Sequence, residues 1–91
     1  MKHYRTRIEI IIQILEAANG VNATKYNIMY KAYLSFNQSK KYVSMLTEKG
    51  VLRYDSDSQT FRTTEKGLML LEAYNALVDM MMLVKNKKEK A

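Results

Sequence analysis

The sequence predicts a mainly helical fold that carries one small β-hairpin. Two observations lead to this expectation. Helical segments occupy the first half of the chain, and one of them begins directly after a short turn at residues 32–35. A glycine, two short strand-like segments around a polar turn, and a long helical segment then follow. This order is that of a winged helix-turn-helix domain, in which the second helix of the motif presents side chains to DNA.

The first helix is predicted over residues 5–18, where apolar residues recur at helical spacing. They form one stripe with a second stripe beside it: Ile8, Ile11, Ile12 and Leu15, then Ile10, Ile14 and Ala17. A helix that is apolar on two faces is either central to the core or shared with another subunit. The second helix is predicted over residues 24–32, with Thr24 as its N-cap.

The third helix is predicted to begin after Ser35. Ser35 and Gln38 have the spacing of a capping box, and Leu34 is the expected apolar plug of the turn. Gly50 is expected to end this helix as a left-handed cap. Short strands at residues 51–54 and 59–62, joined by a polar turn at 55–58, are expected to form the wing.

A long final helix is predicted after Thr63 or Thr64, either of which can cap it. From residue 66 to residue 85 it would be about 30 Å long, more than one small domain usually covers. Its apolar residues recur with the spacing of a heptad seam: Leu70, Tyr74, Leu77, Met81 and Val84. This seam is either a dimer interface or the core-facing side of a helix folded on its own domain. The length of the helix and the second apolar stripe on the first helix favour the dimer.

Composition narrows the range of functions. Lys and Arg number 15 against 9 Asp and Glu, so the net charge is +6, which favours nucleic acid as a partner. Cysteine is absent, so disulfides and thiolate metal sites are excluded. Without a signal-peptide pattern or a membrane-length apolar run, an intracellular location is expected. His3 is the only histidine, and no catalytic motif appears, so we expect no enzyme, metal or cofactor.

Several ordered stretches resemble those of the small archaeal winged-helix proteins that dimerise through a C-terminal antiparallel coiled coil. The matching stretches are residues 7–11, 14–17, 24–30, 32–35, 50–52, 64–67 and 70–71, together with Tyr42 and Leu46. The resemblance implies a homodimer whose third helix and wing face DNA, acting as a regulator or a chromatin protein. It also implies that residues 1–64 form the DNA-binding winged helix and that residues 65–91 form the dimerisation helix with a basic tail, together one structural unit.

The chain departs from that pattern at two places. Asp55 and Asp57 lie at the wing tip, where a wing that contacts phosphates would carry Lys or Arg. Three consecutive methionines, at residues 80–82, lie in the final helix, and methionine packs adaptably but specifies register poorly.

The polar face of the third helix is the main candidate for DNA contact. Four polar residues recur at helical spacing there, with Gln38 beside them: Asn37, Lys40, Lys41 and Ser44. Asn and Gln can pair with adenine, whereas Lys can reach guanine or a phosphate. The alternative is an ordinary solvated helix face. Gln38 has a competing role, because a closed capping box would occupy its side chain.

Other candidate contacts lie outside the third helix. Arg53 and Arg62 on the wing strands could bracket a phosphate or enter the minor groove, or could instead pair with the wing aspartates. Lys25 and Tyr30 lie on the second helix, which crosses the DNA backbone in this architecture, although its rings could instead serve packing. Further backbone contacts could come from residues near the start of the chain: Lys2, Arg5 and Arg7.

These observations predict a homodimeric, cytoplasmic, nucleoid-associated protein. We expect it to bind double-stranded DNA with sequence specificity or with weak sequence specificity. No membrane or small-molecule partner is indicated. One alternative is a winged-helix adapter that binds a protein and whose acidic wing repels DNA. A third possibility is binding of RNA or single strands through exposed tyrosines.

Overall fold

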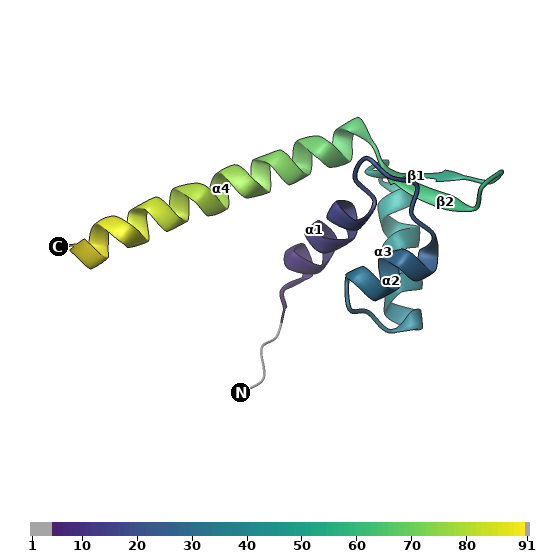
Figure 1. Cartoon of the computed structure of the whole chain (residues 1–91), viewed down its shortest axis with the longest axis horizontal. Helices are drawn as coiled ribbons and strands as arrows, with labels where there is room; N and C mark the ends of the chain where they lie inside the picture. The colour runs from purple at the N-terminus through teal and green to yellow at the C-terminus, as the bar shows by residue number, and fades with distance from the viewer. Residues whose placement is uncertain (1–4, 91) are drawn as a thin grey trace.

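The computed structural model describes residues 5–90, with side chains described as far as residue 83. Its elements, in chain order, are α1 (Arg7–Ala17), α2 (Lys25–Lys31), α3 (Phe36–Glu48), β1 (Leu52–Asp55), β2 (Thr60–Thr63) and α4 (Glu65–Lys90). The first three helices and the hairpin form one body, from which α4 projects (Figure 1). This order confirms the predicted fold class.

Each of the first three helices begins with a capping box, so local sequence alone fixes where it starts. At α3 the Ser35 hydroxyl accepts from the Gln38 backbone N–H at 3.2 Å, and Gln38 Oε1 accepts from the Ser35 backbone N–H at 3.1 Å. This box was predicted, as was Thr24 at the N-cap of α2. The box at α1, made by Thr6 and Glu9, was not.

The turn between α2 and α3 is a Schellman motif with an unusual residue in it. The backbone N–H of Leu34 donates to the carbonyl of Met29 at 3.0 Å, and Tyr33 takes a positive φ of 54°. Glycine usually fills that position, because a Cβ is crowded there. The Arg5 guanidinium donates to the carbonyls of Ala32 and Tyr33, which ties residues far apart in the sequence to the turn.

The core lies where α1 meets the other elements. Its largest fully buried side chains are Ile14, Leu15, Ile28 and Leu52. Both apolar stripes of α1 contribute, since Ile14 and Ala17 are buried together with Ile12 and Leu15. The second stripe is therefore covered largely by the chain's own core, which is the first of the two alternatives that the sequence left open, and it no longer favours a second subunit. Leu34 is also buried, as predicted for the plug of the turn.

The hairpin pairs β1 with β2 in an antiparallel register in which Arg53 faces Arg62 and Tyr54 faces Phe61. Because side chains alternate along a strand, the two arginines share the outer face and the two rings share the inner face. A third segment joins the hairpin at Ala23, whose backbone exchanges hydrogen bonds with Phe61 at 2.9 and 2.7 Å. This bridge, which the sequence did not predict, fixes the hairpin to the segment before α2.

The start of α4 is held closely against the segment before β1. The Thr64 hydroxyl accepts from the Gly67 N–H at 3.1 Å, which makes Thr64 the N-cap, and donates to the Gly50 carbonyl at 2.7 Å. The Thr64 N–H donates to the carbonyl of Val51 at 3.0 Å. Gly50 has a φ of 80° and ends α3 as predicted, so both sides of this junction are fixed by local bonds.

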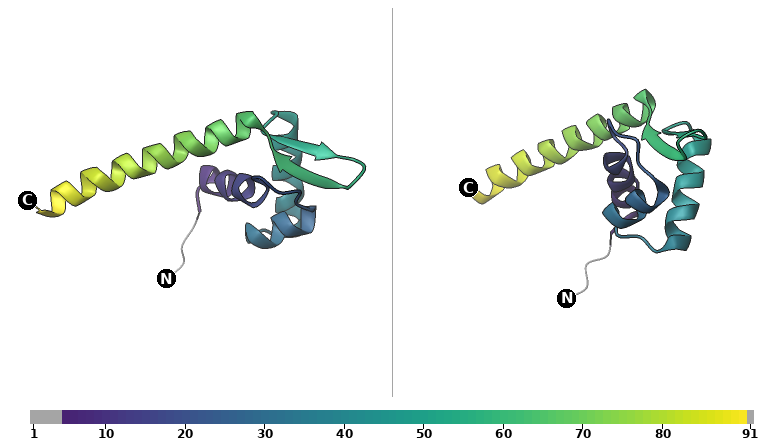
Figure 2. Two further views of the ribbon diagram at one scale, coloured as in Figure 1. Left: turned by 45° about the horizontal axis from the view of Figure 1, so that its top comes forward. Right: turned by 45° about the vertical axis from the view of Figure 1, so that its right-hand side comes forward.

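Farther along, α4 leaves the body. Leu71 is buried and Leu70 and Tyr74 pack partly against the core. Val78 is partly buried, but the other large apolar side chains that follow are 54–65% exposed: Leu77, Met80, Met81, Met82 and Leu83. Figure 2 shows the helix extending away from the other elements in both views. Within residues 5–90, no helix has the length and apolar character needed to cross a membrane.

Candidate nucleic-acid interface

The four predicted residues on α3 lie together on one exposed surface, which we call the polar face of α3: Asn37, Lys40, Lys41 and Ser44. They line a single shallow hollow with three residues that the sequence analysis did not select: Met45, Glu48 and Lys49. The opposite side of α3 is buried through Ser39, Val43 and Leu46. The core therefore fixes which side of α3 faces solvent, and that side carries two ammonium groups and an amide.

Gln38 is also exposed, but its amide oxygen is already occupied. Because Gln38 Oε1 accepts from the Ser35 N–H, the side chain is held back against the first turn of α3. Its amide nitrogen remains as a donor. Gln38 therefore lies beside the polar face of α3 with half of its hydrogen-bonding capacity used by the fold.

The wing arginines face solvent side by side. Arg53 and Arg62 are cross-strand partners, and both are exposed. Arg62 Nη1 donates to Asn22 Oδ1 at 3.4 Å, and both arginines line a hollow that Asn22 and Asp55 also reach. Two guanidinium groups directly opposite each other repel. A phosphate bound between them would relieve that repulsion.

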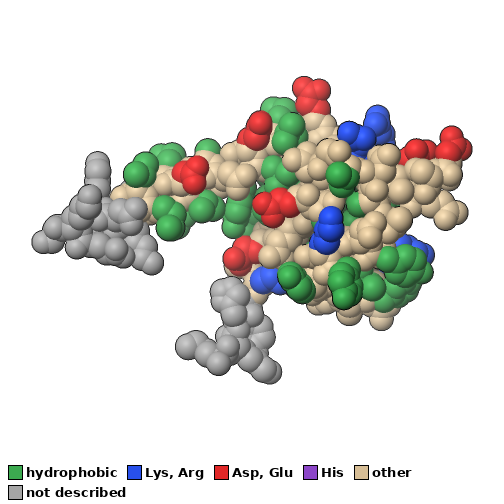
Figure 3. All heavy atoms as spheres, in the orientation of Figure 1, with side chains coloured by type: hydrophobic (Ala, Val, Ile, Leu, Met, Phe, Trp, Pro, Cys, Tyr) green, Lys and Arg blue, Asp and Glu red, His purple; other side chains and the backbone are tan. Residues whose placement is uncertain are grey.

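The acidic wing tip is folded into its own turn. The Asp55 carboxylate accepts from the Asp57 N–H at 3.1 Å and from the Ser58 hydroxyl at 3.0 Å. These bonds give Asp55 a structural role in closing the hairpin. Figure 3 shows that acidic side chains gather at the end of the wing, whereas basic ones lie nearer its base.

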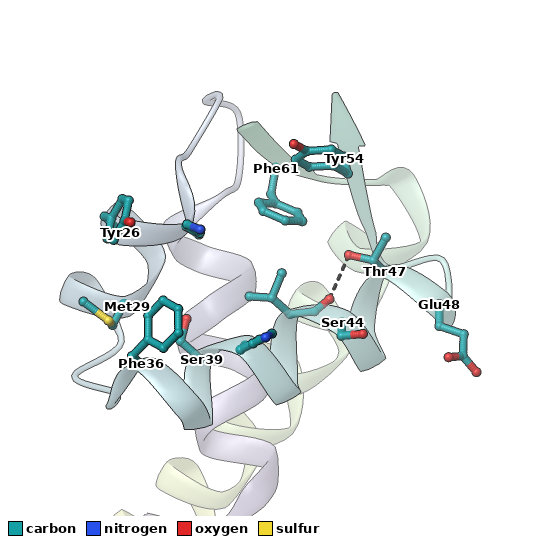
Figure 4. Close-up of a pocket in the computed structure, with 12 residues that line it drawn as sticks. Tyr26, Met29, Phe36, Ser39, Ser44, Thr47, Glu48, Tyr54 and Phe61 are labelled. Carbon is teal, nitrogen blue, oxygen red and sulfur yellow. Dashed lines mark hydrogen bonds between the residues drawn. The ribbon is translucent and has the colours of Figure 1, made fainter. Parts of the chain in front are cut away.

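A groove separates α2, α3 and the hairpin, with a volume of about 600 Å³. Its lining residues are Lys25, Tyr26, Met29, Phe36, Ser39, Lys40, Val43, Ser44, Thr47, Glu48, Tyr54 and Phe61. Figure 4 shows Tyr26, Met29 and Phe36 at one end and Tyr54 with Phe61 across from α3. Lys40 and Ser44 line both this groove and the hollow on α3, so the two surfaces adjoin.

Two residues predicted on α2 lie in different places. Lys25 joins the groove, where its ammonium lies 5.3 Å from the ring centroid of Tyr26 and 5.8 Å from that of Phe36. Tyr30 is 83% exposed and lines neither the groove nor the two hollows. Lys25 is thus placed beside the polar face of α3, and Tyr30 is not.

The cations near the start of the chain have contacts within the fold. Arg5 bonds the turn after α2, and Arg7 lies 5.8 Å from the ring centroid of Tyr42 with Nη2 3.5 Å from the sulfur of Met45. Lys2 lies outside the described residues. The structure therefore gives Arg5 and Arg7 roles in packing rather than leaving them as unattached charges.

The predicted seam of α4 divides into two parts. Leu70 and Tyr74 lie half-buried against the chain's own core, whereas Leu77 and Met81 are exposed. The side chain of Val84 lies outside the described ones. The first part of the seam thus attaches α4 to the body, and the second part is available to a partner.

The residues that sequence reasoning missed fall into two groups. Glu48 extends the helical spacing of Asn37, Lys41 and Ser44, so continuing the stripe by one turn would have found it. The rings of the groove, by contrast, come from α2, α3 and both strands. No spacing within one segment relates them.

Comparison with known proteins supports this architecture. A family model described as winged helix-turn-helix matches residues 4–82. Among matching solved structures, the DNA-binding protein Sso10a-2 from Sulfolobus solfataricus aligns with a TM-score of 0.77 at 23% identity, over 94% of this chain and 92% of that one. MepR from S. aureus, solved as a complex with DNA, aligns with a TM-score of 0.67 at 18% identity, over 93% of this chain and 73% of that one. No curated protein sequence matches the chain.

Proposed function

The chain belongs to the winged helix-turn-helix family, and we propose that it binds double-stranded DNA as a homodimeric, non-enzymatic regulator or chromatin-type protein. The observation that carries this proposal is the exposed polar face of α3, on the helix that directly follows the tight turn. Sso10a-2 is a DNA-binding protein of similar fold, and MepR was solved with DNA bound. A DNA-binding role implies an intracellular, nucleoid-associated location.

In this proposal α3 enters the major groove. Lys40 and Lys41 contact phosphates or guanine, and Asn37 offers an amide that can pair with adenine. Ser44 extends the same face, and the free donor of Gln38 adds a contact at its edge. Recognition of the base sequence is modest, because only Asn37 among these side chains has the bidentate geometry that distinguishes adenine.

The remaining contacts position the domain on the duplex. Arg53 and Arg62 hold a phosphate between them at the base of the wing, while the acidic tip stays away from the backbone. Lys25, at the first turn of α2, reaches the backbone beside α3. Tyr30 contributes a phosphate contact only if the DNA extends past α2, since Tyr30 lies away from the polar face of α3.

The homodimer rests on the exposed part of α4. Leu77 and Met81 lie one helical turn apart and belong to the predicted seam, with Leu70, Tyr74 and Val84 completing it. An exposed apolar row of this length is costly in water, and pairing it with a second copy removes that cost. A two-fold dimer would present two α3 helices to half-sites separated by a helical turn of DNA or a multiple of it.

The test is fluorescence-anisotropy binding to a random duplex over a series of salt concentrations. The Lys40→Ala and Lys41→Ala double variant should bind more weakly, with a slope against log salt lowered by about one for each lost phosphate contact. Lys31→Ala, which removes an exposed lysine of α2 outside the groove and the two hollows, should change affinity less than Lys41→Ala alone.

Two results would contradict the proposal. Unchanged affinity and slope in the double variant would show that α3 is not the contacting helix. Absence of duplex binding by the unmodified chain at low salt would remove DNA as the partner.

A further inference from the structure

The groove between α2, α3 and the hairpin has the size of a small-molecule site. Its volume of about 600 Å³ lies within the roughly 300–1,000 Å³ typical of ligand pockets. Three separate elements line it, and the Ala23–Phe61 bridge and the α3 capping box hold those elements in place. The backbone frame of the groove is therefore set by the fold, while Tyr26, Phe36 and Tyr54 on its walls are 45–58% exposed.

The walls of the groove are mostly apolar and aromatic. Val43 and Met29 contribute aliphatic surface, and Phe61 forms a pair with Tyr54 in which the ring centroids lie 4.8 Å apart at 44°. Phe36 lies at the other end, together with Tyr26 (Figure 4). Aromatic rings thus line the groove at both ends, and a flat apolar molecule can stack against such ring surfaces.

The charged side chains at the groove favour a ligand with a negative charge. Lys25 lines the end formed by Tyr26 and Phe36, where its ammonium is held over both rings, and Lys40 lines the groove from α3. Glu48 points away from the space at the opposite end (Figure 4). The Thr47 hydroxyl already donates to the Val43 carbonyl at 2.8 Å. An anionic group would therefore lie at the lysine end.

We infer that this groove binds a small, flat aromatic molecule that carries one negative charge, and that this ligand competes with DNA. The first part rests on the groove alone. The second part rests on the proposed function, because Lys40 and Ser44 line both the groove and the polar face of α3. A bound anion beside Lys25 and Lys40 would offset positive charge that, under the proposed function, contacts the duplex.

The first experiment is an NMR titration of the full chain, labelled with nitrogen-15, with 2-naphthoate and with its neutral analogue 2-naphthalenemethanol. Amide shifts should concentrate at groove residues of α2, α3 and both strands. Naphthoate should bind about twofold to fivefold more tightly than the alcohol, since the lysines at the groove are exposed to solvent. Lys25→Gln should remove most of that difference and leave binding of the alcohol unchanged.

A matched pair of tyrosine variants tests the location. Tyr26→Ala removes a ring from the groove and should weaken binding of both probes, whereas Tyr30→Ala removes a ring of the same helix outside the groove and should not. Shifts confined to α4, or equal effects of the two variants, would overturn the inference. So would an alcohol that binds as tightly as naphthoate.

The second experiment adds naphthoate to a preformed complex of the chain with fluorescent duplex. Release of the duplex, at naphthoate concentrations that fill the groove, supports competition. If the duplex stays bound while naphthoate occupies the groove, the inferred competition with DNA is wrong and the inferred ligand site still stands. If the chain binds naphthoate but no duplex, the proposed function fails on its own and the ligand site stands.

Discussion

Replacing Gly67 with alanine is expected to destabilise the protein, although alanine is the better helix former. A Cβ at Gly67 would lie 2.4 Å from the Val51 carbonyl oxygen and 2.7 Å from Cγ2 of Thr63. That same carbonyl accepts the hydrogen bond from the Thr64 N–H, so it cannot move away without losing the bond. The start of α4 must shift instead.

Opposing terms set the size of the effect. Overpacking of this kind costs about 1–3 kcal/mol, whereas glycine-to-alanine replacement in a helix gains at most about 1 kcal/mol. We therefore expect the free energy of unfolding to fall by about 1–2 kcal/mol. For a domain of this size that corresponds to a lowering of Tm by roughly 5–15 °C.

The assay is thermal and urea unfolding followed by circular dichroism at one fixed protein concentration, because a dimer's stability depends on concentration. Asn75→Ala, at an exposed position of the same helix, serves as the control and should change stability by no more than about 0.5 kcal/mol. A rise in Tm for Gly67→Ala would show that helix propensity outweighs packing and that α4 does not approach Val51 this closely.

Three further predictions concern other elements. Tyr33→Gly should stabilise the chain by about 0.5–1 kcal/mol in urea unfolding, because glycine adopts a positive φ without crowding; a lower urea midpoint would contradict this. Ser35→Ala should cost about 1 kcal/mol through loss of the α3 cap, and an unchanged midpoint would exclude that role. Leu77→Glu should convert the proposed dimer to monomer or unfolded chain in light scattering, whereas a stable dimer of unchanged mass would refute the interface.

The features that could be predicted depend only on residues close together in the sequence. The Ser35–Gln38 box, Gly50 at the end of α3 and the polar face of α3 each follow from spacings of three or four residues. The same reasoning would have found the α1 box, because Thr6 and Glu9 carry the same spacing. Hydrogen bonds between neighbouring residues form these features, so the local sequence is sufficient to predict them.

Features that join distant segments could not be predicted. Arg5 serves a turn 27 and 28 residues away, and Ala23 pairs with Phe61 across the chain. Likewise, the periodicity of α1 showed two apolar stripes but not whether a second subunit or the chain's own core covers the second one. The groove required knowledge of which rings from α2, α3 and the hairpin face one another.

The firm attachment of α4 at Thr64 and Gly67 gives the protruding helix a fixed angular register relative to α3. One residue inserted between Tyr74 and Leu77 would turn the exposed apolar row by about 100° and advance it by about 1.5 Å. Seven inserted residues would bring the row back to within about 20° of its original direction and lengthen the helix by about 10 Å. In an antiparallel dimer joined through this row both protomers would carry the insertion, so the two α3 helices would move about 20 Å farther apart, close to the rise of six base pairs.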